Sequence, residues 1–329
     1  MNWNGKRVTV TGGAGFIGSH LCEALVAAGA KVTVFTRYSS NGIQGALRDV
    51  PKDVFDALEI IAGDLRDPSG VYDAISGSDV VFHLAAHIGI PYSYVHPIDV
   101  LQVNVNGTGN VLEACRRNNV EKLVVFSTSE TYGTAQYTPI DEDHPLHPQS
   151  PYAASKVGAD QLALSYARSF DLPVAICRPF NTYGPRQPAR AVLPTIIIQA
   201  LAGDVIKLGS LTPTRDLVFA TDTARGAMRI AEEPATVGEV INLATGAEVS
   251  VGDLANTVIG LLGGHHRIET DQSRVRPEKS EVHQLLGASE KARTMLGWQA
   301  ETTLAEGLQQ TVEWVKRNRH LLADIEYRI

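Results

Sequence analysis

The stretch Thr11-Gly12-Gly13-Ala14-Gly15-Phe16-Ile17-Gly18 stands between a short apolar run, Lys6 to Val10, and an apolar-periodic segment, Ser19 to Ala28. A strand, a glycine-rich turn and a helix in this order predict a phosphate site, because glycines let the backbone approach a pyrophosphate at the helix N-terminus. The spacing is G-x-x-G-x-x-G rather than the commoner G-x-G-x-x-G. We therefore expect a dinucleotide to contact Gly12, Gly15, Phe16, Ile17 and Gly18.

The same alternation of strand and helix continues along the N-terminal half of the chain. β-Branched and apolar runs occur at 31–35, 58–61, 80–84, 123–127 and 174–178, and helical patterns separate them, the longest at 100–118 and 152–170. Continuous apolar strands alternating with helices predict a parallel sheet that is covered on both faces. The expected fold class is α/β, a Rossmann doubly wound parallel sheet with a smaller C-terminal α+β substrate lobe.

After Pro179 the alternation becomes irregular. Prolines and glycines interrupt 181–190 and 203–213, which is typical of ligand-facing loops. Strands at 217–219 and 240–243 are expected to rejoin the sheet, and helices at 251–262 and 304–318 to belong to a smaller lobe. We therefore expect a dinucleotide-binding domain of residues 1–180 and 217–250, and a substrate lobe of residues 181–216 and 251–329.

Composition argues against several classes of partner. The 329 residues carry a formal net charge of −7 at pH 7, which disfavours bulk attraction to nucleic acid or to an anionic membrane. No apolar run approaches transmembrane length, and the N-terminus lacks the pattern of a signal peptide. Cys22, Cys115 and Cys177 are isolated and lack metal-ligand spacing. We therefore expect no metal site and a reducing, cytoplasmic location.

The end of the second strand indicates which dinucleotide is bound. Folds that bind NAD usually place Asp or Glu there to bond the ribose 2′-hydroxyl, but this chain has Thr36-Arg37-Tyr38-Ser39-Ser40. A guanidinium flanked by hydroxyls suits a 2′-phosphate, so NADP is favoured over NAD. The alternative is that Arg37 stacks on adenine or faces solvent. Other strand ends at the same edge supply further expected cofactor contacts: Asp64, Leu65, Leu84, Ala85 and Ala86.

The catalytic candidates begin with Tyr152 and Lys156, which are four residues apart and so share one face of the expected helix. A nearby ammonium lowers the phenol pKa from about 10, so that a tyrosinate can remove a hydroxyl proton while hydride leaves the same carbon. The pair therefore predicts oxidation of an alcohol. Thr128-Ser129-Glu130 adds a carboxylate that hydride transfer alone does not require, which predicts further chemistry on the oxidised substrate.

Four segments together carry a resemblance that spans nearly the whole chain: 11–18, 127–133, 150–156 and Arg178-Pro179-Phe180-Asn181-Thr182-Tyr183-Gly184-Pro185. They resemble the extended short-chain dehydrogenase/reductase family (NAD-dependent epimerases and dehydratases), specifically its nucleotide-sugar 4,6-dehydratases of the GDP-mannose and UDP- or GDP-N-acetylglucosamine type. The resemblance implies a tightly bound, recycled cofactor and a nucleoside diphosphate sugar in the smaller lobe. It also implies a homodimer packed through the helices at 100–118 and 152–170.

The resemblance further implies a reaction. The sugar is oxidised at C4, water is eliminated across C5–C6, and hydride returns to C6 to give a 4-keto-6-deoxy sugar nucleotide. Tyr152 would be the base at the C4 hydroxyl, and Lys156 its electrostatic partner and a ribose ligand. Thr128 would bond the C4 oxygen and Glu130 would be the base at C5. Ser129 stands where the thymidine-type enzymes have Asp, which leaves open the group that protonates the leaving hydroxyl.

Substrate-binding residues follow from the same resemblance. Arg215 and Arg276 match the family's positions for diphosphate-binding arginines, whose guanidinium forks satisfy two phosphate oxygens at once. Further candidates on the substrate side are His87, Ser129, Asn181 and Arg190. Three alternatives remain open: a UDP-glucuronate decarboxylase, whose motif also contains Thr-Ser-Glu, a nucleotide-sugar 4-epimerase, and a catalytically silent dinucleotide-sensing regulatory protein.

Overall fold

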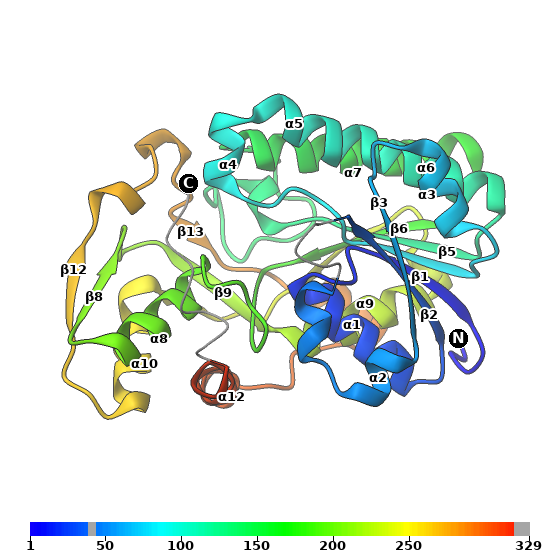
Figure 1. The fold of residues 1–329 in the computed structure, drawn as a ribbon. Helices are drawn as coiled ribbons and strands as arrows, with labels where there is room; N and C mark the ends of the chain where they lie inside the picture. The colour runs from blue at the N-terminus through cyan, green and yellow to red at the C-terminus, as the bar shows by residue number, and fades with distance from the viewer. Residues whose placement is uncertain (39–43, 319–329) are drawn as a thin grey trace.

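A seven-stranded parallel sheet forms the centre of the molecule in the computed structural model, which describes residues 1–38 and 44–318 (Figure 1). Its strand order is β10-β6-β5-β4-β1-β2-β3. The order reverses between β1 and β4, so the carboxyl ends of these two neighbours frame a crevice of the kind in which open α/β sheets bind ligands. The strands are β1 (Arg7–Thr11), β2 (Lys31–Arg37), β3 (Leu58–Gly63), β4 (Val80–His83), β5 (Lys122–Phe126), β6 (Val174–Pro179) and β10 (Val240–Leu243).

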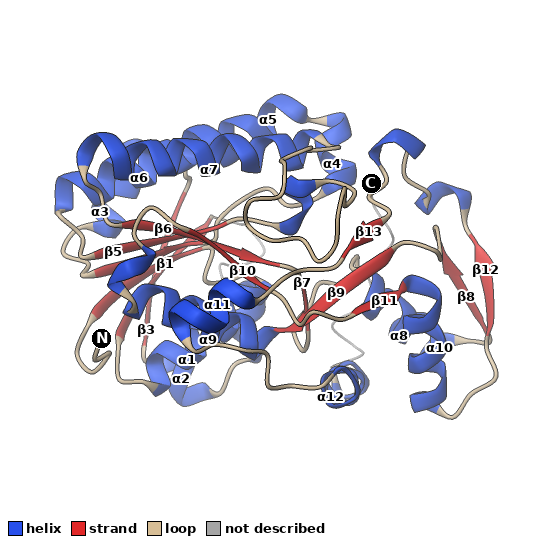
Figure 2. Cartoon of the chain, turned by 180° about the vertical axis from the view of Figure 1, so that it is seen from behind, coloured by secondary structure: helices blue, strands red, loops and turns tan. Residues whose placement is uncertain are grey.

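Helices cover both faces of this sheet, as the views from front and back show (Figures 1 and 2). One layer holds α3 (Pro68–Ile75), α5 (Pro97–Leu101), α6 (Gly107–Asn118) and α7 (Pro151–Phe170). The opposite layer holds α1 (Phe16–Ala27), α2 (Lys52–Asp56), α9 (Ala220–Glu232) and α11 (Glu290–Leu296). Every residue of β4, β5 and β6 is buried, which explains their continuous apolar sequence. The Rossmann arrangement predicted from the alternation is therefore confirmed.

A separate hydrophobic core, apart from those that pack on the large sheet, lies at the other end of the molecule from α3. The elements around it are α8 (Val192–Ala202), α10 (Val251–Leu262), α12 (Leu304–Arg317), β8 (Val205–Leu208) and β12 (Arg267–Thr270). The helices predicted at 251–262 and 304–318 are confirmed as α10 and α12.

A strand is present at 217–219, but the prediction that it rejoins the large parallel sheet is wrong. It is the end of β9 (Thr214–Phe219), which pairs with β7 (Asn181–Tyr183), β11 (Glu248–Ser250) and β13 (Gln284–Leu285) in a separate sheet. The first half of β9 carries Arg215 and Asp216, and the buried Asp216 carboxylate accepts hydrogen bonds from the backbone of Thr245, Gly246 and Gly287.

The layer of α5 and α6 contains an irregular turn. The helix predicted over 100–118 is interrupted by a π-helical segment, Gln102–Asn106, between α5 and α6. Asn104 lies inside it and is almost fully buried. Its side chain accepts a hydrogen bond from His87 N at 2.7 Å and donates to His87 O at 2.9 Å, so it holds the loop that follows β4. Single π turns are frequent at functional sites.

Candidate active site

The glycine-rich turn joins β1 to α1, with Gly15 as the N-cap residue of that helix. Gly12 has a φ of 74°, and a Cβ there would lie 2.7 Å from Ala85 N. A Cβ on Gly18 would collide with the Gly12 carbonyl oxygen. Side chains are thus excluded from both positions, and the amide end of α1 stays open to a phosphate. The predicted contacts Leu84, Ala85 and Ala86 follow β4 beside this turn, where Ala85 N donates to Thr11 Oγ1 at 3.3 Å.

Arg37 and Asp64 lie at the ends of adjacent strands. Arg37 pairs with Gly63 across β2 and β3, and its side chain is exposed. Asp64 forms an ion pair with Arg66 at 2.6 Å, and a hydrogen bond from Arg66 lowers the pKa of this carboxyl. Leu65 is buried. Ser39 and Ser40, which were part of the NADP prediction, lie outside the described residues.

The catalytic candidates come together from two elements. Thr128 caps the 3₁₀ turn Ser129–Tyr132, which contains Glu130, and Tyr152 and Lys156 lie in the first turns of α7. Ser150 caps α7 by accepting a hydrogen bond from Ala153 N, with Pro151 as the first helical residue. The Thr128 hydroxyl shares a hydrogen bond with the Tyr152 phenol, and the negative charge of Glu130 acts on the same phenol.

The predicted lowering of the Tyr152 pKa is wrong for this arrangement. Burial raises the pKa of Tyr152, the charges of Glu130 and Asp160 raise it further, and only the Thr128 hydrogen bond opposes them. The Lys156 Nζ donates instead to the carbonyl oxygen of Phe126 at 2.6 Å. Burial also lowers the pKa of Lys156. The phenol is therefore held neutral by its surroundings within the protein.

A buried polar network below Lys156 was missed by the sequence analysis. Asp160 is fully buried, and its Oδ2 accepts hydrogen bonds from Ser127 Oγ at 2.6 Å and from Arg178 Nη2 at 2.8 Å. The charge of Asp160 raises the pKa of Lys156 against the effect of burial. Asp160 is one helical turn beyond Lys156, so the same i, i+4 spacing that related Tyr152 to Lys156 could have identified it.

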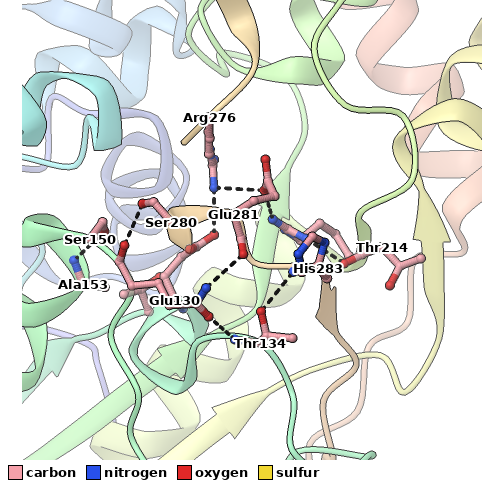
Figure 3. A network of polar contacts seen from close by, with 12 residues as sticks. Glu130, Thr134, Ser150, Ala153, Thr214, Arg276, Ser280, Glu281 and His283 are labelled. Carbon is pink, nitrogen blue, oxygen red and sulfur yellow. Dashed lines mark hydrogen bonds and ion pairs between the residues drawn. The ribbon is translucent and has the colours of Figure 1, made fainter. Parts of the chain in front are cut away.

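Two predicted substrate-side arginines lie near Glu130: Arg276, which Figure 3 labels, and Arg215. Arg276 Nη1 is 4.0 Å from Glu130 Oε1 and 3.6 Å from Glu281 Oε1, while Arg215 Nη2 is 3.5 Å from the same oxygen of Glu281. Glu281 was not predicted. Its position five residues after Arg276 in a polar segment was the one clue in the sequence. The packing of that segment against the 3₁₀ turn cannot be read from the sequence.

The remaining substrate-side candidates are more scattered. His87 Nε2 is 3.1 Å from Asp99 Oδ2, and the charges that act on His87 are those of Asp99, Arg37, Arg66 and Asp64, so its ring lies toward the Arg37 side and not beside Glu130. The other three candidates differ in burial: Ser129 is buried in the 3₁₀ turn, Asn181 is half-buried at the start of β7, and Arg190 is exposed before α8.

Among residues 1–38 and 44–318, no group of three or more His, Cys, Asp or Glu side chains is arranged to hold a metal ion. No helix in the same ranges has the length and apolar character needed to span a membrane.

Comparison with known proteins gives a consistent result. The family described as "GDP-mannose 4,6 dehydratase" matches residues 9–311. UDP-glucose 4-epimerase of Mycolicibacterium smegmatis is 34% identical over 94% of this chain and 98% of its own length. DesIV, a dTDP-glucose 4,6-dehydratase from Streptomyces venezuelae solved with NAD, superposes with a TM-score of 0.86 at 31% identity, over 96% of this chain and 98% of that one. MoeE5 in complex with UDP-glucose and NAD gives 0.83 at 31% identity, over 95% and 99%.

Proposed function

Because this chain belongs to the GDP-mannose 4,6-dehydratase family of NAD-dependent nucleotide-sugar dehydratases and epimerases, we propose that it is a nucleotide-sugar 4,6-dehydratase, a lyase. The observation that carries this proposal is Glu130, a buried carboxylate that acts on the same phenol as Thr128. Hydride transfer alone needs no such carboxylate. Elimination of water across C5–C6 needs a base for the C5 hydrogen, and Glu130 supplies one.

The dinucleotide fits the residues present. The cradle around Gly12 and Gly18 would be filled by any Cβ, and Leu84 to Ala86 follow β4 beside it. A dinucleotide held here would supply an acceptor for the C4 hydride and a donor for its return to C6. We assign dinucleotide contacts to residues 1–180 and 217–250, and substrate contacts to residues 181–216 and 251–329, of which 319–329 lie outside the described residues.

The side chains then divide the proton transfers. Tyr152 first loses its own phenol proton to solvent and then, as the tyrosinate, takes the proton of the C4 hydroxyl, while the Thr128 hydroxyl, which hydrogen-bonds the phenol, aligns it. Lys156 contributes positive charge that favours the tyrosinate when it forms. Glu130 removes the C5 proton and gives it to the leaving C6 hydroxyl, since Ser129 cannot act as an acid of comparable strength. A proton from solvent then adds at C5 as hydride returns to C6. Arg215 and Arg276 bind the diphosphate as guanidinium forks.

For the cofactor we propose NADP, although the solved relatives named above contain NAD. The support is local: β2 ends in Arg37, and the carboxylate that follows the adjacent strand β3, Asp64, is already paired with Arg66. Titration of the purified protein with both oxidised dinucleotides tests this choice. Tighter binding of NAD would contradict it.

We also propose a cytoplasmic homodimer that associates through the layer of α5, α6 and α7. Apolar side chains are exposed on this layer and on the adjoining α4 (Ile90–Val95): Val95 at 60%, Ile98 at 64%, Leu101 at 40% and Phe170 at 53%. Ile98 and Leu101 are three residues apart on α5 and so are neighbours on its surface, and clusters of exposed apolar residues mark association surfaces. Sedimentation velocity should give twice the monomer mass, and a monomer at micromolar concentration would contradict the proposal.

The reaction is tested by incubating the protein with dTDP-glucose, UDP-glucose, GDP-mannose, UDP-N-acetylglucosamine and UDP-glucuronate, followed by mass spectrometry. We expect loss of water from at least one of them, and none with Tyr152→Phe. Loss of carbon dioxide from UDP-glucuronate would instead indicate a decarboxylase. Isomerisation without change of mass would indicate a 4-epimerase, the second candidate, which the M. smegmatis relative favours. A dinucleotide sensor would convert none of the substrates.

A further inference from the structure

Four charged side chains alternate in sign along the substrate side of the site: Glu130, Arg276 and Glu281, which Figure 3 labels, and then Arg215. One oxygen of Glu281 lies 3.6 Å from Arg276 Nη1 and 3.5 Å from Arg215 Nη2. The Glu281 side chain is only 12% exposed, as is that of Arg215. Glu281 is thus a single carboxylate shared by two guanidiniums.

These contacts leave hydrogen-bonding capacity unused. Charge-assisted bonds between a guanidinium and a carboxylate are usually about 2.7–2.9 Å long, and the distances above exceed that range. Among the described residues, the buried Arg276 Nη1 has no hydrogen-bond partner. Burial lowers the pKa of Arg215, and the positive charge of Arg276 adds to this effect, whereas the negative charges of Glu130 and Glu281 oppose it. The charges of the two arginines are therefore compensated, but not all of their N–H groups donate hydrogen bonds. They can donate to an oxyanion that binds more closely than Glu281 does.

The backbone around Glu281 is fixed independently of its carboxylate. Gln149 Nε2 donates to Glu281 O at 2.9 Å, and Ser280 Oγ donates to Gln149 O at 2.6 Å. His283 N donates to Thr134 Oγ1 at 3.2 Å. The segment is thus attached to both ends of the loop that joins the catalytic turn to α7, at Thr134 and at Gln149. The Glu281 side chain can rotate away from the arginines without detaching the segment.

We propose that Glu281 is an internal counter-anion for Arg215 and Arg276, which the diphosphate of the substrate must displace. This inference rests on the proposed function, because it takes that diphosphate as the ligand of the two arginines. Before binding, Glu281 stabilises two neighbouring cations that would otherwise repel each other. On binding, it competes with the phosphate oxygens, so it weakens the affinity for nucleoside diphosphates and favours release of the product.

Calorimetric titration of wild type and Glu281→Gln with UDP, GDP and dTDP tests this competition. The amide keeps the shape of the side chain and removes its charge. We expect every nucleoside diphosphate that binds the wild type to bind Glu281→Gln about tenfold more tightly, since a unit charge a few ångströms from a multiply charged ligand changes binding by this order even in high dielectric. The gain should shrink at high salt because screening weakens the repulsion by Glu281 in the wild type.

Glu278→Gln is the matched control, because Glu278 lies in the same segment and is exposed, and its removal subtracts the same charge. It should bind like the wild type. Glu281→Ala separates charge from spacing: it should also tighten binding if the charge is responsible. Equal or weaker binding by both Glu281 variants would overturn the inference and leave the proposed function intact. Failure of all three nucleotides to bind the wild type would overturn both.

Discussion

We expect two buried histidines, His20 and His83, to lower the free energy of unfolding as the pH falls. His20 Nδ1 accepts a hydrogen bond from Arg186 Nη2 at 2.6 Å, so its Nε2 proton is the one donated to Pro185 O at 2.9 Å. His83 lies between the hydroxyls of Thr11 and Thr108. Burial lowers the pKa of each ring from 6.5 to about 3, and the charge of Arg186 acts in the same direction on His20.

The direction of this pH effect follows from how many protons the folded and unfolded states bind. Below pH 6.5 the unfolded chain binds a proton at each of these histidines and the folded protein does not, so stability is complete above pH 6.5 and falls as the pH approaches 3. Each ring contributes a slope of about 1.4 kcal/mol per pH unit within this window. Between pH 6 and pH 4 one histidine therefore costs the folded state about 2–3 kcal/mol.

Urea unfolding of wild type and His20→Gln at half-unit steps from pH 7.5 to pH 4 measures this contribution. Gln does not titrate, and its side-chain oxygen can still accept from Arg186. The difference in unfolding free energy between the two proteins should change by about 1.4 kcal/mol per pH unit below pH 6. The exposed His265, replaced with Gln, is the control and should give a curve parallel to wild type. A His20→Gln curve parallel to wild type would refute the reasoning.

Three further substitutions test the site. Glu130→Gln should leave oxidation at C4 intact and slow exchange of the C5 hydrogen with deuterated solvent by about 10²–10⁴-fold, because an amide is not a base; wild-type exchange would exclude Glu130 as that base. Gly18→Ala should weaken dinucleotide binding in a fluorescence titration, whereas Gly260→Ala, where a Cβ meets open space, should not. Asp160→Asn should destabilise the fold by about 3–5 kcal/mol, because Arg178 would stay buried without its counter-ion; an unchanged melting temperature would contradict this.

The fold was predictable where local pattern and tertiary structure agree. The glycine-rich turn and the apolar strands each carry their own signal, because a strand buried on both faces must be apolar along its whole length. The partners of β9 were not predictable. A short apolar run such as 217–219 fits any sheet, and its pairing with β7, β11 and β13 depends on contacts between segments that are distant in the sequence. Helix α9 (Ala220–Glu232) was likewise not predicted from the sequence.

The site divides in the same way. Tyr152, Lys156, Thr128 and Glu130 were identified from their spacing and from a family resemblance, and they lie together. The raised pKa of Tyr152 depends on how completely the surrounding chain excludes water, which no spacing reveals. The role of Glu281 depends on contacts between segments more than a hundred residues apart, since Gln149 binds its backbone at a sequence separation of 132 residues.

The π turn at Gln102–Asn106 changes which neighbouring helices α5 and α6 can pack against. One extra residue in a helical turn rotates everything beyond it by about 100° relative to a regular helix. The stretch before the turn can therefore face α7 while the stretch after it also faces α3, which a single unbroken amphipathic stripe would not allow. Deleting one residue here would restore a regular helix but put α5 and α6 out of phase with their neighbours. The loop held by Asn104 would then lose its attachment.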